Sequence, residues 1–506
     1  MTEDRIGFDN EKYLKEQSKI ILDRATQFGN KLYLEFGGKL VYDYHASRVL
    51  PGFDPNVKMK LLKGLKDKIE VIICIYSGDI ERRKIRADFG ITYDINTMKL
   101  IDDLNDGDIN VCGVIITRYN GQQIVKQFMN KLEHRDIKVY THGFIKGYPT
   151  DIDLIISEEG YGANPYIKTS KPIIIVTAPG PGSGKLATCL SQLYHEHRRG
   201  IDAGYAKFET FPIWNLPLKH PVNMAYESAT ADLGDFNQID PFHFEAYDIL
   251  AVNYNRDVEI FPVVKKIMQR IMDSSLIYKS PTDMGVNRAG FAIIDDHIVQ
   301  KAAKQELIRR YLRYSCEFAM GVSDKKTVQR AELLMKELNL TVLDREVVRE
   351  ARQASIAARE KGKGNEGVFA GAALQLANKK IITGSNSPLL HAASSLILNT
   401  IKELAGIPKN IHLLSPNILE SISYLKSEIF NHKRLSLNLE ETLIALSISA
   451  DFNHSAKVAI DRLKELSGCE MHSTHIPTPG DEAGLMRLGL NVTSDPNFSS
   501  KSLFIP

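Results

Sequence analysis

The stretch from Pro172 to Tyr194 constrains the fold of this chain more than any other, because it reads PIIIVTAPGPGSGKLATCLSQLY. An apolar run rich in β-branched residues is followed by a glycine-rich loop and then by a segment with helical periodicity. Gly180, Gly182 and Gly184 lack a Cβ atom, so the loop backbone can curl and direct its N–H groups at an anion. Lys185 would add a positive charge at the start of the helix. The stretch predicts a strand, a phosphate-binding loop and a helix.

The loop departs from the standard Walker A spacing at two positions. Pro179 stands where the first glycine belongs, and Leu186 stands where a Ser or Thr hydroxyl would bind Mg²⁺. Ser183 or Thr188 could supply a hydroxyl instead, but neither lies at the usual register. The spacing therefore favours a site that binds phosphate over one that hydrolyses a nucleotide. We expect the phosphate of a small phosphorylated ligand or nucleotide to be bound by Gly180, Gly182, Ser183, Gly184 and Lys185.

Two other interpretations of the loop stay open. Gly180-x-Gly182 matches the start of a dinucleotide-binding G-x-G-x-x-G, and the next predicted strand, GYAKFET, contains the acidic Glu209 near its end. Against this, Lys185 occupies the third glycine position. The loop could also be a tight structural turn that binds nothing.

The composition is that of a globular protein with an ample core. The 506 residues are 43% hydrophobic and 25% charged, which predicts roughly two to four domains. A net charge of +2 gives no electrostatic footprint for nucleic acid, and the basic run ERRKIR is typical of a solvated helix face. We therefore predict no nucleic-acid partner.

The cysteines and the N-terminal segment point to the cytoplasm. The five cysteines are scattered without a C-x-x-C pair, as expected of reduced core residues. The segment MTEDRIGFDN shows no signal pattern, and no apolar run approaches ~18 residues. We expect a cytoplasmic protein that has no membrane partner.

Short apolar runs alternate with amphipathic segments through the first part of the chain, starting with a helix at Asp9–Phe28. This pattern is typical of strands buried on both faces of a parallel sheet. The predicted fold class is α/β, with a doubly wound, mostly parallel sheet. We place strands at KLYLEFGG, EVIICIY, NVCGVIIT, Ile137–Tyr140, Ile152–Ile156 and before the glycine-rich loop. Because ligands bind beyond the carboxyl ends of such strands, the rim could include Gly37, Gly38, Lys39, Ser77, Asp79, Arg118, His142, Glu158 and Glu159.

The segment Phe208–Arg256, which follows the glycine-rich loop and its helix, is rich in Pro, Asn, His and aromatic residues and has little periodicity. Long ordered loops of this kind often contain functional residues. We expect His220, Asp240 and His243 to be the catalytic residues, acting in proton transfer. A domain interface packed by aromatic side chains is the alternative.

The rest of the chain predicts a helical middle domain and a second, smaller α/β domain, with boundaries at 1–235, 236–340 and 341–506. The loop SPTDMGVNRAG in the middle domain could contact a ligand or, as we favour, cap helices. In the last domain we predict a strand at Lys379–Gly384, a helix from Pro388, and a second strand and helix in IHLLSPNILESISYL. The polar segment Ser385–Ser387 could be a second anion site or a plain helix cap.

Metal-binding patterns are incomplete, and we predict no metal site. HEHRR has Arg199 where H-E-x-x-H requires histidine. Cys469, His472 and His475 recur at three-residue spacing without a fixed carboxylate partner. Together with the incomplete Walker A motif, these patterns speak against an ATP-dependent zinc peptidase.

Several segments together resemble the bacterial domain-of-unknown-function family 1846: GFDNEKYL, VTAPGPGSGKLATCLSQLYHEH, FETFPIWNLPLKHPVN, IDPFHFEAY and PTDMGVN. The resemblance runs from Gly7 to about Pro496. It implies a cytosolic bacterial protein with a P-loop-like α/β part, a helical part and a C-terminal α/β part. It implies no particular reaction.

Two functional hypotheses follow. In the first, the chain is an enzyme that binds a phosphorylated metabolite or nucleotide at Gly180–Lys185 and catalyses phosphoryl or acyl transfer. In the second, it is a homo-oligomer or a filament-type assembly whose aromatic and proline-rich segments form the contacts between subunits. The zinc peptidase is rejected in both.

Overall fold

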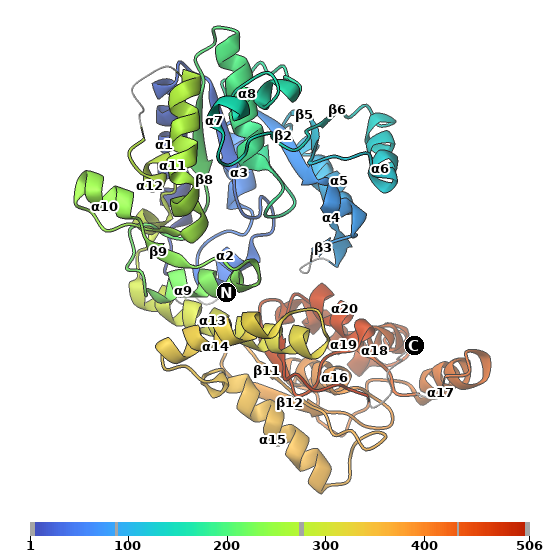
Figure 1. Cartoon of the computed structure of the whole chain (residues 1–506). Helices are drawn as coiled ribbons and strands as arrows, with labels where there is room; N and C mark the ends of the chain where they lie inside the picture. The colour runs from blue at the N-terminus through green and yellow to red at the C-terminus, as the bar shows by residue number, and fades with distance from the viewer. Residues whose placement is uncertain (1–5, 87–89, 273–277, 433–434, 501–506) are drawn as a thin grey trace. The chain divides into compact units, whose positions relative to one another are not determined.

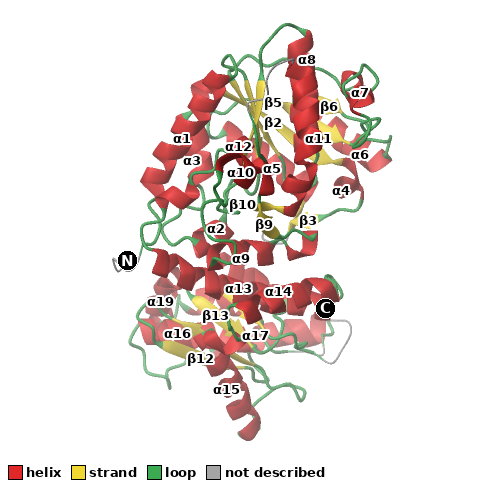
Figure 2. Ribbon diagram, turned by 60° about the vertical axis from the view of Figure 1, so that its left-hand side comes forward, coloured by secondary structure: helices red, strands yellow, loops and turns green. Residues whose placement is uncertain are grey.

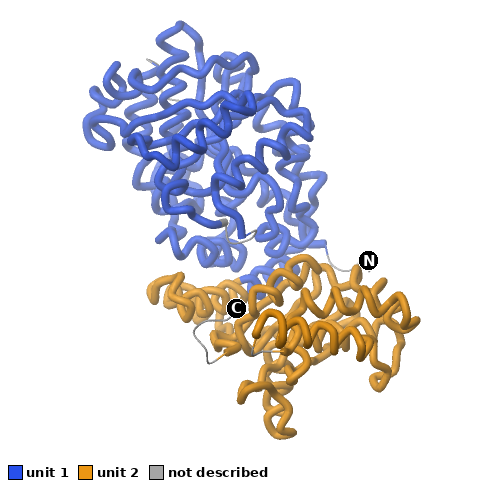
Figure 3. The backbone as a smooth tube through the Cα atoms, turned by 90° about the vertical axis from the view of Figure 1, so that its right-hand side faces the viewer, with its two compact units in different colours: residues 1–306 blue, residues 307–506 orange. Residues whose placement is uncertain are grey.

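A computed structural model describes residues 6–86, 90–272, 278–432 and 435–500 of the chain. The chain forms two compact units, residues 1–306 and residues 307–506, which are described separately below (Figure 3). The further division of the chain at 235 and 340 stays a prediction. No helix within the described ranges has both the length and the apolar character needed to cross a membrane.

Unit 1 is built on a six-stranded sheet in which every pair of neighbouring strands is parallel (Figure 1). The adjacent inner strands β2, β7 and β1 are almost entirely buried, as their apolar sequences predict. The predicted parallel α/β sheet is confirmed. In spatial order the strands are β6 (Val139–Thr141), β5 (Val111–Thr117), β2 (Ile69–Tyr76), β7 (Ile173–Thr177), β1 (Leu32–Phe36) and β8 (Gly204–Phe208).

The strand order creates a switch in direction at the centre of the sheet. The connection from β1 to β2 crosses over β7 and leads toward the β6 edge of the sheet. The connection from β7 to β8 crosses over β1 and leads toward the opposite edge. Right-handed crossovers then place the helices on both faces, so the sheet is doubly wound (Figure 2). The carboxyl ends of β1 and β7, which are neighbours, therefore border a crevice of the kind that binds ligands in such sheets.

Helices account for most of the remainder of unit 1, and two short antiparallel strand pairs complete it. The pairs are β3 (Ile85–Arg86) with β4 (Ile91–Thr92), and β9 (Asn237–Ile239) with β10 (Val252–Tyr254). The helices are α1 (Asn10–Gln27), α2 (Tyr44–Val49), α3 (Val57–Gly64), α4 (Ser77–Glu81), α5 (Tyr93–Asn105), α6 (Gln123–Glu133), α7 (Ile152–Ile155), α8 (Lys185–Arg198), α9 (Pro221–Ala229), α10 (Pro241–Tyr247), α11 (Asn255–Met272), α12 (Pro281–Met284) and α13 (Asp296–Ala319), which continues into unit 2.

Local signals explain where several helices begin. Asp9 caps α1 by accepting a hydrogen bond from the Lys12 amide. Ser280 and Asp283 form a reciprocal capping box around α12, so the SPTDMG segment does cap a helix. The predicted strand at Ile152–Ile156 is wrong, because the Asp151 carboxylate caps the short helix α7 there.

Unit 2 contains a smaller, mixed sheet of four strands in the order β12, β11, β13 and β14, of which only β13 and β14 are parallel to each other. Helix α15 packs on β11, β12 and β13, while α16 packs on β11 and β12. The strands are β11 (Gly371–Gln375), β12 (Ile381–Ser385), β13 (Glu470–Ser473) and β14 (Asn491–Ser494). The helices are α14 (Lys325–Glu337), α15 (Glu346–Glu360), α16 (Ala392–Leu404), α17 (Pro416–Tyr424), α18 (Leu439–Ser449), α19 (His454–Ile460) and α20 (Pro479–Arg487).

The smaller C-terminal α/β part is confirmed, with two corrections. The apolar run IHLL forms no strand, so the predicted tandem repeat of strand and helix is absent from this described part of the chain. Helix α16 begins at Ala392 with His391 as its N-cap residue, four residues later than Pro388. Pro388 and Leu389 instead belong to a turn in which the Ser387 hydroxyl accepts hydrogen bonds from the Leu389 and Leu390 amides.

Candidate functional site

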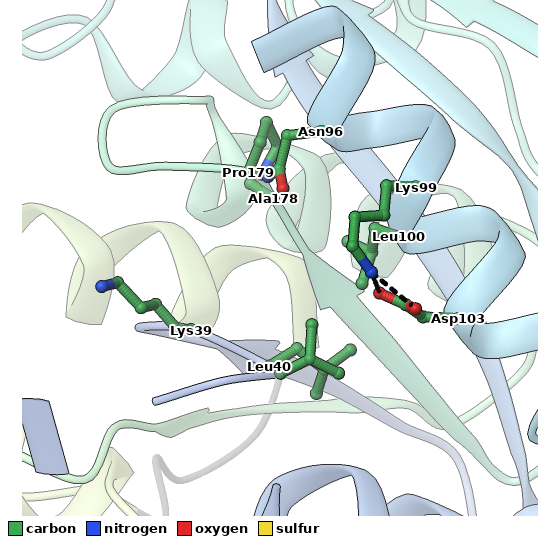
Figure 4. A pocket seen from close by; sticks show the side chains of 9 residues that line it. Lys39, Leu40, Asn96, Lys99, Leu100, Asp103, Ala178 and Pro179 are labelled. Carbon is green, nitrogen blue, oxygen red and sulfur yellow. Dashed lines mark hydrogen bonds and ion pairs between the residues drawn. The ribbon is translucent and has the colours of Figure 1, made fainter. Parts of the chain in front are cut away.

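The glycine-rich loop follows β7 at the carboxyl edge of the sheet, as predicted from the sequence. A small pocket lies beside it, between the segment after β1, the end of β7 and helix α5 (Figure 4). Its volume is about 10 Å³, which is room for about one water molecule. The pocket is therefore too small for a phosphate group, and the exposed face of the loop lies at Pro181 and Gly182. The pocket is lined by Lys39, Leu40, Val41, Asn96, Lys99, Leu100, Asp103, Ala178 and Pro179.

Two loop glycines adopt left-handed backbone conformations, with φ of 69° at Gly182 and 84° at Gly184. Gly180 is required for a different reason, because a Cβ atom there would lie 2.4 Å from the Tyr93 hydroxyl oxygen. Ser183 is buried, and its hydroxyl donates a 2.9 Å hydrogen bond to the Gly180 carbonyl. The Ser183 side chain therefore holds the loop in shape and does not face outward.

The start of α8 has no side-chain cap. Its N-cap residue is Gly184, which has no side chain to accept a hydrogen bond from the N–H groups of the first turn. Within the described residues, no acceptor is found for the N–H groups of Gly182, Ser183, Gly184 and Lys185. These groups lie at the positive end of a 14-residue helix. They are donors for which an external anion is the natural acceptor.

Arg118, which follows β5, brings a positive charge to this loop. Its guanidinium donates to the Gly182 carbonyl and lies 3.5 Å from the centre of the Tyr76 ring. The Arg118 backbone is left-handed, with φ of 52°, and its carbonyl accepts a hydrogen bond from the Ser77 hydroxyl. Arg118 was one of many predicted rim residues, but nothing in the sequence singled it out.

Lys185 does not extend toward solvent. Its side chain is 11% exposed, and its Nζ lies 3.9 Å from Oε1 of Glu35 on β1. Glu35 also accepts a 2.8 Å hydrogen bond from the Tyr205 hydroxyl. The charge of Lys185 is thus directed at the interior of unit 1, because β1 lies directly beside β7 and places a buried carboxylate next to α8.

The position of Glu209 in the structure does not support the dinucleotide interpretation. Glu209 follows β8, which is separated from β7 by β1. Its carboxylate packs against Gly37, where a Cβ atom would lie 2.2 Å from Glu209 Cγ, and it lies 3.5 Å from Lys207. Burial raises the pKa of Glu209. Glu209 is therefore part of a buried charge cluster and is not placed to bind a ribose next to the glycine-rich loop.

The predicted catalytic residues are buried and hydrogen-bonded to neighbouring segments. Asp240 caps α10 through the His243 amide and also accepts hydrogen bonds from the amide and hydroxyl of Thr282. His243 Nδ1 lies 2.9 Å from the Ser280 hydroxyl. His220 caps α9, and its Nε2 lies 2.9 Å from Asp296. No contact among the described residues joins His220, Asp240 or His243 to the glycine-rich loop, and their role in catalysis stays a prediction.

Glu158 does not lie on the same rim as the loop. It accepts hydrogen bonds from Tyr194 and Arg198, near the C-terminal end of α8. A helix of 14 residues is roughly 20 Å long, so Glu158 lies at the opposite edge of the sheet. The prediction for Glu158 is wrong because the preceding segment is the helix α7, not a strand.

The histidines and cysteines singled out in the sequence do not converge. Cys469 belongs to the apolar core on one face of the unit 2 sheet. His472 is three residues away on the alternating strand β13 and contacts Thr493 and Asp495 instead. Within the described residues no group of three or more His, Cys, Asp or Glu side chains could hold a metal ion.

Comparison with known proteins confirms the resemblance found in the sequence. Residues 6–339 match the domain of unknown function DUF1846, N-terminal, and residues 343–504 match its C-terminal counterpart. A UPF0371 protein of Clostridium botulinum strain Eklund 17B is 58% identical over 500 residues, which is 99% of both chains. UPF0371 proteins of strains Alaska E43 and 657 are each 57% identical over 500 residues, with 99% of both chains covered. The chain therefore belongs to the DUF1846 family.

Proposed function

We propose that the glycine-rich loop of unit 1 binds the phosphate group of a small phosphorylated metabolite or nucleotide. The observation that carries the proposal is the uncapped start of α8, where four successive N–H groups of Gly182–Lys185 have no acceptor among the described residues. Left-handed glycines beside such N–H groups are typical of the backbone concavities that hold anions. All five predicted residues, Gly180, Gly182, Ser183, Gly184 and Lys185, would act through the backbone of the loop.

The charges around the loop support an anionic ligand. The Arg118 guanidinium is held by the Gly182 carbonyl and the Tyr76 ring, which leaves further N–H donors for a phosphate. Lys185 pairs with Glu35, so this buried carboxylate has a counter-ion. In this proposal Arg118 supplies the charge that the sequence assigned to Lys185.

Within this proposal the reaction class is phosphoryl or acyl transfer, and His220, Asp240 and His243 are the candidates for proton transfer. Each is tied by hydrogen bonds to a neighbouring segment of unit 1. Chemistry at these residues would require those bonds to be exchanged for bonds to substrate. The binding step is therefore the part to test first.

Calorimetric titration of inorganic phosphate, pyrophosphate and nucleotides into the full chain tests the binding step. Arg118→Gln removes the charge but keeps a hydrogen-bond donor, and loss of a charge-assisted contact should weaken binding about ten- to a hundredfold. Arg135→Gln, at an exposed arginine after α6, is the matched control and should leave the affinity unchanged. Equal affinities of the Arg118 variant and the parent, or no binding by either, would mean that the loop is only a tight turn.

A homo-oligomer is the second candidate, and one surface favours it. Four large apolar side chains at and after the end of α10 are exposed, by 47% at Phe244, 39% at Tyr247, 50% at Ile249 and 65% at Leu250. Exposed apolar residues clustered in this way often mark a protein contact. Sedimentation analysis of the parent and of Leu250→Glu tests this, because a contact through this surface predicts a concentration-dependent oligomer that the variant abolishes. A monomeric parent would contradict it.

A further inference from the structure

Unit 2 contains a second pocket, distinct from the glycine-rich loop of unit 1. It lies between α16, the segment that joins β12 to α16, the segment before α17, and α17 itself. Its volume is about 310 Å³, which is the lower end of the range for small-molecule sites. The segment Ser385–Ser387, which the sequence suggested as a second anion site, forms part of its wall.

The lining of this pocket is amphipathic. One wall is a stripe along α16 at helical spacing: Ser395, Leu398, Asn399 and Lys402. Six of the fourteen lining residues are leucines, and the polar ones are hydroxyls, amides, two lysines and a histidine. None of the lining residues is Asp or Glu. The pocket therefore offers apolar surface and positive charge without a competing carboxylate.

Lys402 is the cation on the α16 wall of this pocket. It is half-buried, and its Nζ donates to the Lys409 carbonyl at 3.2 Å. Among the described residues no carboxylate forms an ion pair with it, and the adjacent Glu403 pairs with Lys380 instead. Burial lowers the pKa of Lys402, as expected of an ammonium group that is partly desolvated without a counter-ion. An anion in the pocket would supply that counter-ion.

We propose that this pocket binds a small amphipathic anion, namely a short aliphatic chain that ends in a carboxylate or a phosphate. The leucines hold the chain, Lys402 and Lys363 face the anionic head, and the serine and asparagine side chains hydrogen-bond to it. The site is independent of the function proposed for unit 1, because every lining residue belongs to unit 2.

Titration calorimetry on the full chain tests this with octanoate, octyl phosphate, inorganic phosphate and 1-octanol. One or both octyl anions should bind more tightly than inorganic phosphate and than the neutral alcohol, and their relative affinities identify the head group. Each buried methylene group tightens binding about fourfold. Octanoate has two more methylene groups than hexanoate, so hexanoate should bind about fifteenfold more weakly. This chain-length series needs no variant.

Lys402→Met removes the charge and keeps an apolar stem, so it should weaken binding of the octyl anions at least tenfold and leave 1-octanol unaffected. Lys457→Met, an exposed position on α19 outside the pocket, is the matched control and should change nothing. Arg118→Gln in unit 1 should leave the binding of octanoate, which has no phosphate group, unaffected. Absence of binding, equal affinities for octanoate and 1-octanol, or an undiminished affinity in a folded Lys402→Met variant would overturn the proposal.

Discussion

The Lys185 ammonium lies 3.9 Å from the Glu35 carboxylate, and both side chains are about nine-tenths buried. The first residue of the loop helix is thereby tied to the neighbouring strand β1. A buried ion pair adds little net stability by itself, but removal of one partner leaves the other charge unpaired in the interior.

Lys185→Ala should therefore destabilise the fold by about 3 kcal/mol, although alanine is the better helix former. Urea unfolding of the parent and the variant measures the loss. The double variant Lys185→Met with Glu35→Gln removes both charges and should recover much of the stability. A single variant as stable as the parent would mean that the ion pair contributes nothing to the loop.

The two left-handed glycines of the loop should respond differently to alanine. At Gly182 a Cβ atom would meet open space, so Gly182→Ala should lose only about 1 kcal/mol from the left-handed backbone. At Gly184 a Cβ atom would also lie 2.9 Å from Thr117 Cγ2, and the added crowding should raise the loss to about 2–3 kcal/mol. Unfolding in urea ranks the two variants.

Gly200 gives the matched control for these substitutions. It is also left-handed, with φ of 71°, and a Cβ atom there would have open space around it. Gly200→Ala should therefore resemble Gly182→Ala. If Gly184→Ala lost no more unfolding free energy than Gly200→Ala, the Thr117 side chain would have to move aside at little cost. The loop would then be less rigid than its contacts indicate.

The sequence predicted the strand, loop and helix at β7 and α8 because a β-branched run buried on both sides has a distinctive composition. It failed at Ile152–Ile155, because a short apolar run does not distinguish a strand from one turn of helix. Strand β11 was not predicted at all. Its small residues Ala372 and Ala373 have little strand preference, and pairing with β12 and β13 makes the segment a strand.

The side-chain part of the site was harder to predict than its backbone part. The glycines identified the loop, but the direction of Lys185 depends on β1 lying beside β7, which is a matter of strand order. In the same way, Arg118 comes from β5, two strands away from β7, and reaches the loop through a left-handed turn. Neither relationship has a local sequence signal.

Asp240 should behave as a structural cap in a stability measurement. Its fully buried carboxylate accepts three hydrogen bonds, one from the His243 amide and two from Thr282. Asp240→Ala would leave these donors unsatisfied and should lose about 2–4 kcal/mol of unfolding free energy. Asp240→Asn keeps one oxygen acceptor and should lose less. An alanine variant of unchanged stability would contradict the structural role and would favour the catalytic prediction for Asp240.

His142 should make the protein less stable as the pH falls. The ring is 3% exposed, and its Nε2 has no hydrogen-bond partner among the described residues. Burial, with a smaller contribution from the charge of His195, lowers the pKa of His142 to about 4, against about 6.5 in an unfolded chain. Between these values the unfolded chain binds more protons than the native one, so the unfolding free energy decreases as the pH falls. Above pH 6.5 both states hold His142 neutral, and its full contribution to stability is present.

That contribution should be lost between about pH 6.5 and pH 4, by about 3 kcal/mol in total. His142→Phe keeps a ring of similar shape but cannot bind a proton. As the pH falls through that window, the parent should therefore lose unfolding free energy relative to this variant. Above the window the difference between the two should stay constant. His134→Phe, at an exposed histidine after α6, is the control for the replacement of a histidine by phenylalanine. If the parent and His142→Phe lost stability in parallel from pH 7 to pH 4, the buried ring would not be the group that titrates.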